Sequence, residues 1–249
     1  MAPLRKPYQG VTNIVRFNAP FFLIAAALSV GLLAACGFAP AGLRPWIGLA
    51  LAAVILATVV PLAVSFVVYD RSGFYLLPWL DGWKNSAPRL VNIHSGFDET
   101  SAILSTLFPA SPLTVLDFHD PAIHTESSIR RARAAYPAFP GTRPCTTGSL
   151  PLPDAESDLV LLTLAAHEIR NDEERQRFFR EIRRVLAPDG RVFVVEHVRN
   201  SANVLAYHLG VFHFHPLKTW LLSFRAAGLL LHRQSRHTPF ITVFELRHP

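Results

Sequence analysis

Two pairs of a histidine and a glutamate stand out as groups that could move a proton. His167 precedes Glu168 directly after one apolar run, and Glu196 precedes His197 directly after a second. Histidine is the side chain whose ordinary pKa suits proton transfer near neutral pH, and a positioned base is what reaction at a hydroxyl or amine requires. We therefore expect the catalytic candidates in an acceptor pocket to be His167 or His197, followed by His208 and His213.

The segment from His208 to His215 is rich in histidine and reads HLGVFHFH. Imidazoles are common metal ligands, and His213 and His215 would alternate along a strand. No cysteine joins them, however, and alternate positions on one strand do not form a closed coordination set. We therefore expect no metal site here. The neighbouring aromatic residues are interpreted as an apolar lid over a hydrophobic acceptor: Phe212, Phe214, Trp220 and Phe224.

Farther upstream, a glycine and an acid stand where a nucleotide-type ligand could be held. Gly96 follows the apolar run 89–93, and Asp117 lies near the end of the next run, 113–118. Glycine lets the backbone approach a ligand closely, and an acid at the end of a strand can accept both hydroxyls of a ribose. The pattern predicts a ligand site at the carboxyl ends of two strands.

Alternating strands and helices must position these residues. The run 158–164 is almost purely apolar, as expected of a strand that is buried on both faces. The following helix begins at Asn171, with Glu174 completing a capping box, and ends at the Pro188-Asp189-Gly190 turn. Strand 191–196 comes next. Strand, helix and strand in this order form one unit of a parallel sheet.

The rest of the chain from residue 89 continues the same alternation. This predicts an α/β fold with a doubly wound, Rossmann-like, mostly parallel sheet that ends in an antiparallel strand. The elements that we expect besides those above are strands 89–93 and 113–118, a helix ending near Phe108 between them, a helix at 217–227, and an antiparallel pair of strands at 229–236 and 238–247.

From about Arg89 to Arg247 the chain resembles the class I S-adenosylmethionine-dependent methyltransferases, in particular their small-molecule branch. The most specific segments are LPLPDAESDLVLLTLAAHEI and EIRRVLAPDGRVFVVE, supported by VNIHSGFDETS, TVLDFHDP and SSIRRARAAYP. The resemblance implies S-adenosyl-L-methionine as the cofactor. It implies these cofactor-binding residues: His94, Ser95 and Gly96 in the first loop, Asp117 at the ribose, Phe118 and His119 beside the adenine, Thr146, Thr147, Ser149 and Leu150 after the third strand, and Ala165 and Ala166 at the methionine end.

The first loop departs from the family's pattern in its residue types. Asn92, His94 and Asp98 stand where that family has an acid and two glycines. In the loop after the third strand, Thr146 or Thr147 replaces the usual acid.

The first third of the chain is apolar enough to enter a membrane. No charged residue lies between Arg16 and Arg44 or between Arg44 and Asp70, and a helix needs roughly 20 apolar residues to span a bilayer. We expect transmembrane helices at about 20–39 and 45–69. Basic residues flank the pair on both outer sides, which places both termini and the catalytic domain in the cytoplasm, at a bacterial-type inner membrane.

Two other interpretations of this region are open. The two apolar segments could be core helices of a soluble protein. The sequence Leu33-Ala34-Ala35-Cys36 also resembles the cleavage box of a bacterial lipoprotein, which would place the α/β domain outside the cytoplasm. Cys36 and Cys145 lie far apart and indicate no disulfide framework.

Residues 72–88 connect the apolar region to the α/β domain. Aromatic side chains dominate the segment, and tyrosine and tryptophan favour the headgroup level of a membrane, which predicts an interfacial linker. A linker that packs in the core is the alternative. The net charge of +6 could draw the domain towards anionic lipid, whereas the interleaving of arginines with Glu173, Glu174 and Glu181 indicates a solvated face and argues against nucleic acid as a partner.

Together these observations divide the chain into a membrane anchor (1–71), the linker (72–88) and a methyltransferase-like domain (89–249). The function that they favour is methylation of a lipid-soluble acceptor, such as a quinone, an isoprenoid or a lipid. A membrane-tethered binding or scaffold protein that has lost catalysis is the alternative. A dinucleotide-dependent oxidoreductase is a third possibility, because a loop glycine and a strand-end acid would serve that chemistry too.

Overall fold

A single mixed sheet organises the domain in the computed structural model, which describes residues 5–249. Its seven strands follow the order β3-β2-β1-β4-β5-β7-β6. The pairs from β3 to β5 are parallel, and β7 runs antiparallel to both of its neighbours, as the sequence predicts. The strands are β1 (Leu90–His94), β2 (Leu113–Asp117), β3 (Arg143–Pro144), β4 (Ser157–Thr163), β5 (Leu186–His197), β6 (Leu230–Thr238) and β7 (Ile241–Arg247).

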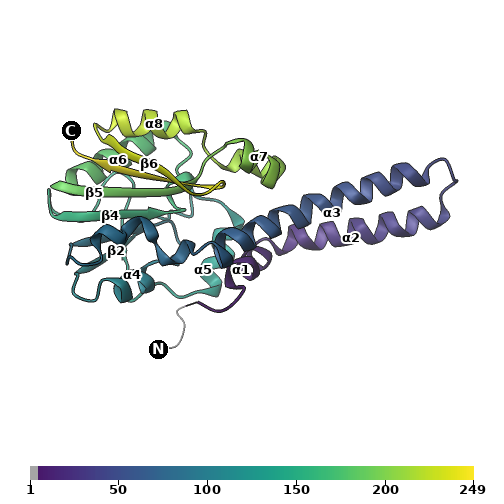
Figure 1. The fold of residues 1–249 in the computed structure, drawn as a ribbon, viewed down its shortest axis with the longest axis horizontal. Coiled ribbons are helices and arrows are strands. Elements are labelled where there is room, and N and C mark those ends of the chain that lie inside the picture. Colours follow the sequence, from purple (N-terminus) through teal and green to yellow (C-terminus); the bar gives the residue numbers. More distant parts are fainter. Residues whose placement is uncertain (1–4) are drawn as a thin grey trace.

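One face of the sheet is covered by two amphipathic helices, α6 (Asp172–Val185) and α8 (Leu217–Ala226) (Figure 1). The Asn171 side chain accepts a hydrogen bond from the backbone N–H of Glu174 at 2.9 Å, so the predicted start of α6 is confirmed. The expected reciprocal half of the capping box is wrong. The Glu174 carboxylate accepts instead from the hydroxyl of Thr147 at 2.7 Å, which ties α6 to the loop after β3.

The opposite face of the sheet is covered by the linker, contrary to the interfacial position that we expected for residues 72–88. Phe74, Leu77 and Leu80 are fully buried in a second apolar cluster together with residues of α4 (Ser101–Leu107). The linker packs here because α4 has only seven residues and is too short to cover the apolar surface of this face of the sheet. The apolar linker covers the rest, which is the alternative interpretation of its composition.

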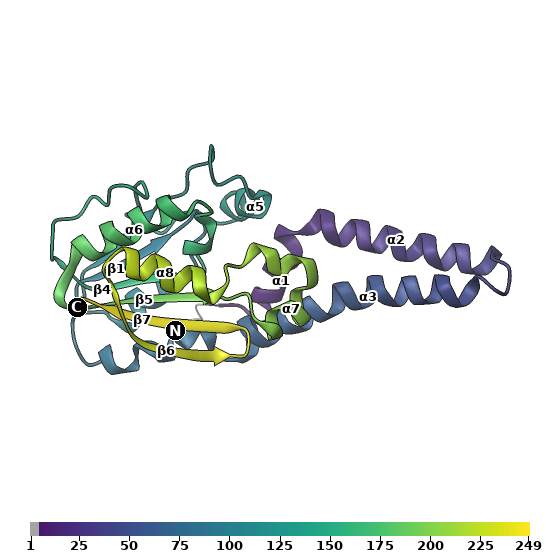
Figure 2. The same ribbon diagram turned by 90° about the horizontal axis from the view of Figure 1, so that it is seen from above.

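The two apolar segments form a helical hairpin that projects from the domain (Figures 1 and 2). They are α2 (Ala19–Phe38) and α3 (Arg44–Phe66), and α3 continues into a π-helical turn, Val67–Arg71. Large apolar side chains point outward along both helices, and Leu23 is 70% exposed. Core helices of a soluble protein would hide such side chains, whereas α2 and α3 each bury a single residue. Both helices are long and apolar enough to be candidate membrane spans.

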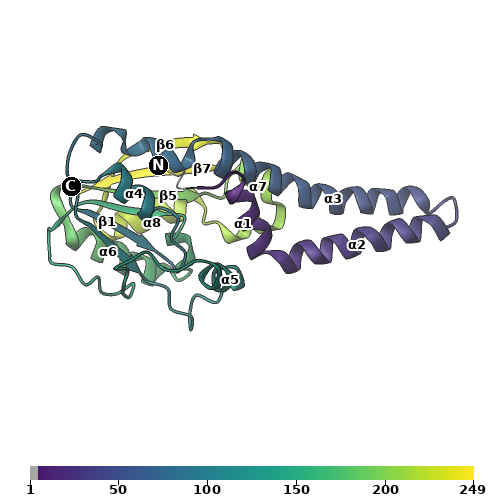
Figure 3. The same cartoon turned by 90° about the horizontal axis from the view of Figure 1, so that it is seen from below.

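A short amphipathic helix that the sequence analysis missed, α1 (Gln9–Phe17), lies at the base of the hairpin (Figure 3). The carboxylate of Asp70 accepts hydrogen bonds from the backbone N–H groups of Gly10 and Val11, at 2.8 and 2.9 Å. The helix was missed because no side chain next to it in the sequence caps its start. Its cap comes from Asp70, which lies in the turn after α3.

The contact between α1 and this turn requires a glycine at position 10. A Cβ atom at Gly10 would lie 2.4 Å from Cβ of Tyr69 and 3.0 Å from either carboxylate oxygen of Asp70. We expect Gly10→Ala to displace α1 and to destabilise the protein by about 1–3 kcal/mol, as for other overpacked contacts. Thermal unfolding in detergent measures the change. Gly37→Ala is the matched control, because nothing lies within 4 Å of its added Cβ; equal melting temperatures for both variants would contradict the close contact.

Candidate functional site

The carboxyl ends of four parallel strands meet at the edge of the sheet that faces the hairpin (Figure 2). A cavity of about 730 Å³ lies there. Its lining comes from the strand ends, from α5 (Ser127–Ala135), from the segment that begins with α7 (Ser201–Tyr207), and from α1, α2 and α3. All four predicted catalytic candidates line this cavity: His167, His197, His208 and His213.

His167 is held by a fully buried carboxylate on the neighbouring strand. Glu196 Oε2 lies 2.8 Å from His167 Nδ1, and Glu196 Oε1 accepts a hydrogen bond from the His167 backbone N–H at 3.2 Å. Glu168 Oε1 lies 3.3 Å from the other ring nitrogen, Nε2. Burial alone would lower the pKa of His167, but the charges of Glu196 and Glu168 outweigh it and raise the pKa to about 10. His167 is therefore a positioned imidazole between two carboxylates.

His197 is fixed by contacts through both of its ring nitrogens. Nε2 lies 2.7 Å from the Tyr69 hydroxyl, and Nδ1 lies 3.1 Å from the backbone carbonyl of Phe240. The ring also stacks on Phe214 at 4.7 Å between centroids. Burial, reinforced by the nearby His167, lowers the pKa of His197 to about 3, so the ring is neutral and links the hairpin to the sheet.

The segment HLGVFHFH forms a 3-10 turn, His208–His213, and not the expected strand. His213 turns into the cavity, with Nε2 3.6 Å from Glu168 Oε1. His215 instead lies beside Arg175 and the carbonyl of Ile169, each at 3.3 Å from its Nε2. The three histidines of this segment are therefore not brought together, because alternation along a strand is absent.

The predicted aromatic lid is also largely wrong. Trp220 and Phe224 belong to α8 and are fully buried in the apolar cluster between that helix and the sheet. Phe212 is 65% exposed and does not line the cavity. Phe214 alone of the four lines it, against His197. Their helical spacing in α8 places Trp220 and Phe224 on the core face.

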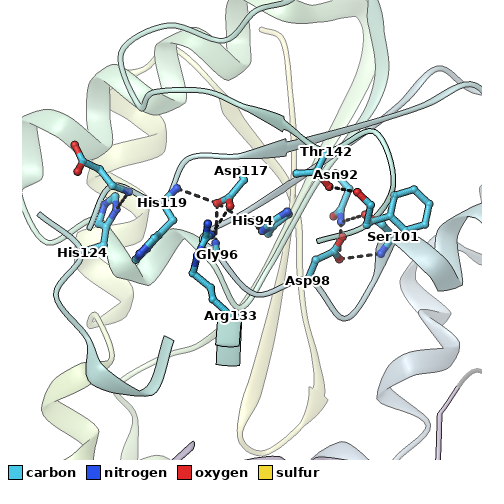
Figure 4. A network of polar contacts seen from close by, with 12 residues as sticks. Asn92, His94, Gly96, Asp98, Ser101, Asp117, His119, His124, Arg133 and Thr142 are labelled. Carbon is cyan, nitrogen blue, oxygen red and sulfur yellow. Dashed lines mark hydrogen bonds and ion pairs between the residues drawn. The ribbon is translucent and has the colours of Figure 1, made fainter. Parts of the chain in front are cut away.

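The expected ribose acid, Asp117, is held in a network at the ends of β1 and β2 (Figure 4). Its Oδ1 accepts from the backbone N–H groups of Gly96 and His119, at 2.8 and 3.0 Å, and its Oδ2 accepts from Arg133 of α5 at 2.5 Å. Burial would raise the pKa of this carboxyl, but His94, the His119 N–H and Arg133 together lower it below its ordinary value. Asp117 is thus an ionised acceptor at the strand end.

The side chains that replace the family's acid and glycines are satisfied locally. The Asn92 amide donates to Asp98, Thr100 and Ser101, and Asp98 accepts from the backbone N–H groups of Thr100 and Ser101, both at 2.9 Å (Figure 4). These bonds fix the start of α4, because the Asp98 carboxylate, just before the helix, accepts from its first backbone N–H groups. A glycine-rich loop would expose its backbone N–H groups to a ligand. In this chain, hydrogen bonds between side chains take up that part of the loop.

Buried polar atoms around Asp117 fit a polar ligand. Within residues 5–249, neither ring nitrogen of His94 has a hydrogen-bond partner, and the Ser95 hydroxyl and His119 Nδ1 also have none. Buried polar groups without partners are rare in proteins and indicate a missing partner. The space in front of Gly96 is occupied by α5: an added Cβ would lie 3.0 Å from side-chain atoms of Ile129 and Arg133. These groups therefore fit a polar cofactor such as S-adenosylmethionine, and the Arg133 side chain occupies Asp117 Oδ2, which such a ligand could otherwise contact.

The other predicted cofactor residues lie around this network, and of all twelve only His94 lines the cavity. Phe118 is buried against Phe178 in the core. Thr146 and Ser149 pair across a turn, Thr147 contacts Glu174, and the Leu150 N–H donates to Glu181. Ala165 and Ala166 are buried in the core beneath His167. The polar loop thus borders the cavity, because Asn92, His94 and Thr100 of that loop line it.

Several cavity residues were missed by the sequence analysis. Tyr69, at the end of an apolar helix, and Thr163, at the end of β4, both line the cavity. Within residues 5–249, the buried hydroxyl of Thr163 has no hydrogen-bond partner. Asn13 and Phe17 come from α1. Tyr69 and Thr163 could have been found, because each is a polar residue at the end of an apolar run. The residues of α1 could not, because nothing in the sequence marked that segment as a helix.

The comparisons with known proteins give a family model that matches part of the chain, and a fold. Residues 94–194 match a family model described as a methyltransferase domain. A search of curated protein sequences found no match. Many solved structures resemble the chain, among them a protein described as a SAM-dependent methyltransferase from Methanosarcina mazei, with 15% identity, TM-score 0.51, and coverage of 69% of this chain and 97% of that one.

Two further structures resemble the chain slightly more closely in shape. PH0226 from Pyrococcus horikoshii has 13% identity and TM-score 0.54, covering 73% of this chain and 91% of its own. The mitomycin 7-O-methyltransferase MmcR has 17% identity and TM-score 0.54, covering 99% of this chain and 74% of its own. At these identities the likeness establishes a shared fold.

Proposed function

We propose that this enzyme, a methyltransferase with S-adenosylmethionine as its cofactor, methylates a hydrophobic acceptor that reaches the site from a membrane. One observation carries the proposal. The cavity at the sheet edge is continuous from His167 and His197 to Phe21, Ala57 and Pro61 on the hairpin. A water-soluble acceptor would have no need of a cavity that begins between two apolar helices.

The hairpin supports a membrane location in the proposed arrangement. Its outward apolar side chains have no protein partner among residues 5–249, and a bilayer would cover them. Arg16, in the last turn of α1 before α2, and Arg71, at the end of the turn after α3, flank the hairpin on its outer sides, where basic residues favour the cytoplasmic side. The catalytic domain would then share the cytoplasm with its cofactor.

We assign the cofactor to the loop around Asp117. The carboxylate would accept the ribose hydroxyls, and the unpartnered groups of His94, Ser95 and His119 would contact the rest of the molecule. When bound, S-adenosylmethionine supplies an electrophilic methyl group. The chain's own task is to orient the acceptor in line and to remove its proton, and the cluster of His167, Glu168 and His213 stands where the cavity meets the sheet.

A labelling experiment tests the function. The full chain, purified in detergent, is incubated with S-adenosylmethionine carrying a radioactive methyl group and with a cell extract split into organic and aqueous fractions. We expect label in a product of the organic fraction. Label confined to the aqueous fraction overturns the hydrophobic acceptor, and cofactor binding without transfer to either fraction supports a non-catalytic binding protein.

Arg133 competes with the ribose for Asp117 in this assignment. Its guanidinium donates to Asp117 Oδ2, an oxygen that the ribose hydroxyls would need, and its side chain is 44% exposed and thus free to leave. We expect Arg133→Gln to tighten S-adenosylhomocysteine binding by about three- to tenfold, since an ion pair of this exposure is worth about 1 kcal/mol. Isothermal titration calorimetry measures the change, and Arg130→Gln on the exposed face of α5 is the control. Weaker binding by Arg133→Gln would instead make the arginine a cofactor ligand.

A further inference from the structure

The cluster of His167, Glu168 and His213 has the geometry of a metal site. One side-chain ligand atom from each residue lies within 4.8 Å of the other two. The Glu168 Oε1 atom is 3.3 Å from His167 Nε2 and 3.6 Å from His213 Nε2. With metal–ligand bonds of about 2.1 Å, neighbouring ligand atoms lie about 3.0 Å apart at right angles and about 3.4 Å apart at tetrahedral angles. The two distances from Glu168 therefore match ligands around one ion, and the two imidazole nitrogens lie within 4.8 Å of each other.

The groups behind these ligands are also arranged for a metal. Glu196 is fully buried and lies 2.8 Å from His167 Nδ1, so that the Nδ1 proton is held there and Nε2, which would give up its own proton to bind an ion, faces the cluster. A carboxylate that orients a histidine in this way is typical of metal centres. On the other histidine, Glu126 Oε1 lies 3.5 Å from His213 Nδ1. Arg170 donates to the His213 carbonyl at 2.6 Å and also to Nδ1, and this second contact has to open when Nε2 binds an ion, because Nδ1 then carries the ring proton and points it to Glu126.

The charges in the cluster leave room for a divalent cation. Glu126, Glu168 and Glu196 bring three negative charges to the two imidazoles, and Arg170 brings one positive charge. With both imidazoles neutral, which is the form that binds a metal, two negative charges remain. Two of the three carboxylates, Glu168 and Glu196, are buried. Buried charges require partners, and a doubly charged ion would neutralise this set.

We propose that His167, Glu168 and His213 bind a divalent first-row transition metal such as Zn²⁺, Fe²⁺ or Mn²⁺. Two imidazoles among three ligands favour these ions over Mg²⁺ and Ca²⁺, which prefer oxygen. Three protein ligands leave coordination positions open, and all three residues line the cavity, so the open positions face the acceptor space. This inference rests on the proposed function: the ion would hold an oxygen atom of the acceptor, which favours oxygen-bearing acceptors such as phenols and hydroxyquinones.

Binding of Co²⁺ tests the metal site without any methyl transfer. The tag-free full chain, treated with chelator and returned to detergent buffer, is titrated with Co²⁺ alone while the visible absorption is recorded. We expect saturable bands at one ion per chain, displaced by Zn²⁺. Glu168→Gln and His213→Ala should each lower the affinity at least tenfold, as loss of one ligand does. His208→Ala should leave it unchanged, because His208 lines the same cavity outside the cluster.

The outcomes separate the metal site from the proposed function. Circular dichroism of each variant establishes that it is folded, and two independent ligand substitutions guard against the loss of one to misfolding. Absence of Co²⁺ bands in the folded wild-type chain, or equal affinity in all variants, overturns the metal site and leaves an ion-paired cluster. Labelled methyl transfer into the organic fraction tests the proposed function separately, since the cobalt signal needs no acceptor.

Discussion

Asp117→Asn should weaken the binding of S-adenosylhomocysteine by roughly 30-fold. The asparagine oxygen can still accept from the Gly96 and His119 N–H groups, so the loop should keep its shape. What is lost is the charge that would face the ribose hydroxyls, and a hydrogen bond to a charged group is worth about 2 kcal/mol. Isothermal titration calorimetry on the full chain in detergent gives the dissociation constants.

The control for this substitution is Asp189→Asn, an exposed acid in the turn before the main part of β5. It removes the same charge far from the strand ends and should leave binding unchanged. Equal dissociation constants for Asp117→Asn and the wild type would move the cofactor away from the ends of β1 and β2. A normal melting temperature for both variants is required for this comparison to count.

The sheet was predictable because its signals are local. The apolar runs of β4 and β5, the cap at Asn171 and the glycine after α8 each act within a few residues, and their order alone selects a doubly wound fold. The C-terminal pair of strands followed in the same way. The bounds differ by a few residues: β5 already begins at Leu186, before the predicted turn, with an irregular register against β4.

The parts that sequence reasoning missed depend on contacts between distant segments. Helix α1 is capped by Asp70, and the linker is buried only because α4 is too short to cover its face of the sheet. Neither fact has a local signature. The same holds for the site. His167 and His213 were each predicted as catalytic candidates. Both lie beside Glu168 because the segment with His213 forms a turn, where a strand was expected.

The part of the cavity between the hairpin helices, here called the neck, offers a test of the proposed route from a membrane. Ala57 of α3 lines the cavity, whereas Ala53, one turn earlier on the same helix, is exposed and does not. A tryptophan at position 57 would occupy the part of the cavity that lies between the helices of the hairpin, beside Phe21 and Pro61. We therefore expect Ala57→Trp to lower kcat/KM for the hydrophobic acceptor at least tenfold, the effect of losing about 1.4 kcal/mol in the transition state, with unchanged S-adenosylhomocysteine binding.

Ala53→Trp is the matched control for Ala57→Trp, because it adds the same side chain one turn away on the same helix, at an exposed position that does not line the cavity. It should leave both methyl transfer and cofactor binding at the wild-type level. A fall in transfer by both variants would indicate disturbed packing of the hairpin, and equal activity of all three proteins would mean that the acceptor enters elsewhere. Only an acceptor that occupies the neck is sensitive to the added ring. If Ala57→Trp raises KM more for long-chain than for short-chain acceptors, the chain of the acceptor therefore lies between α2 and α3 while its reactive end lies at His167.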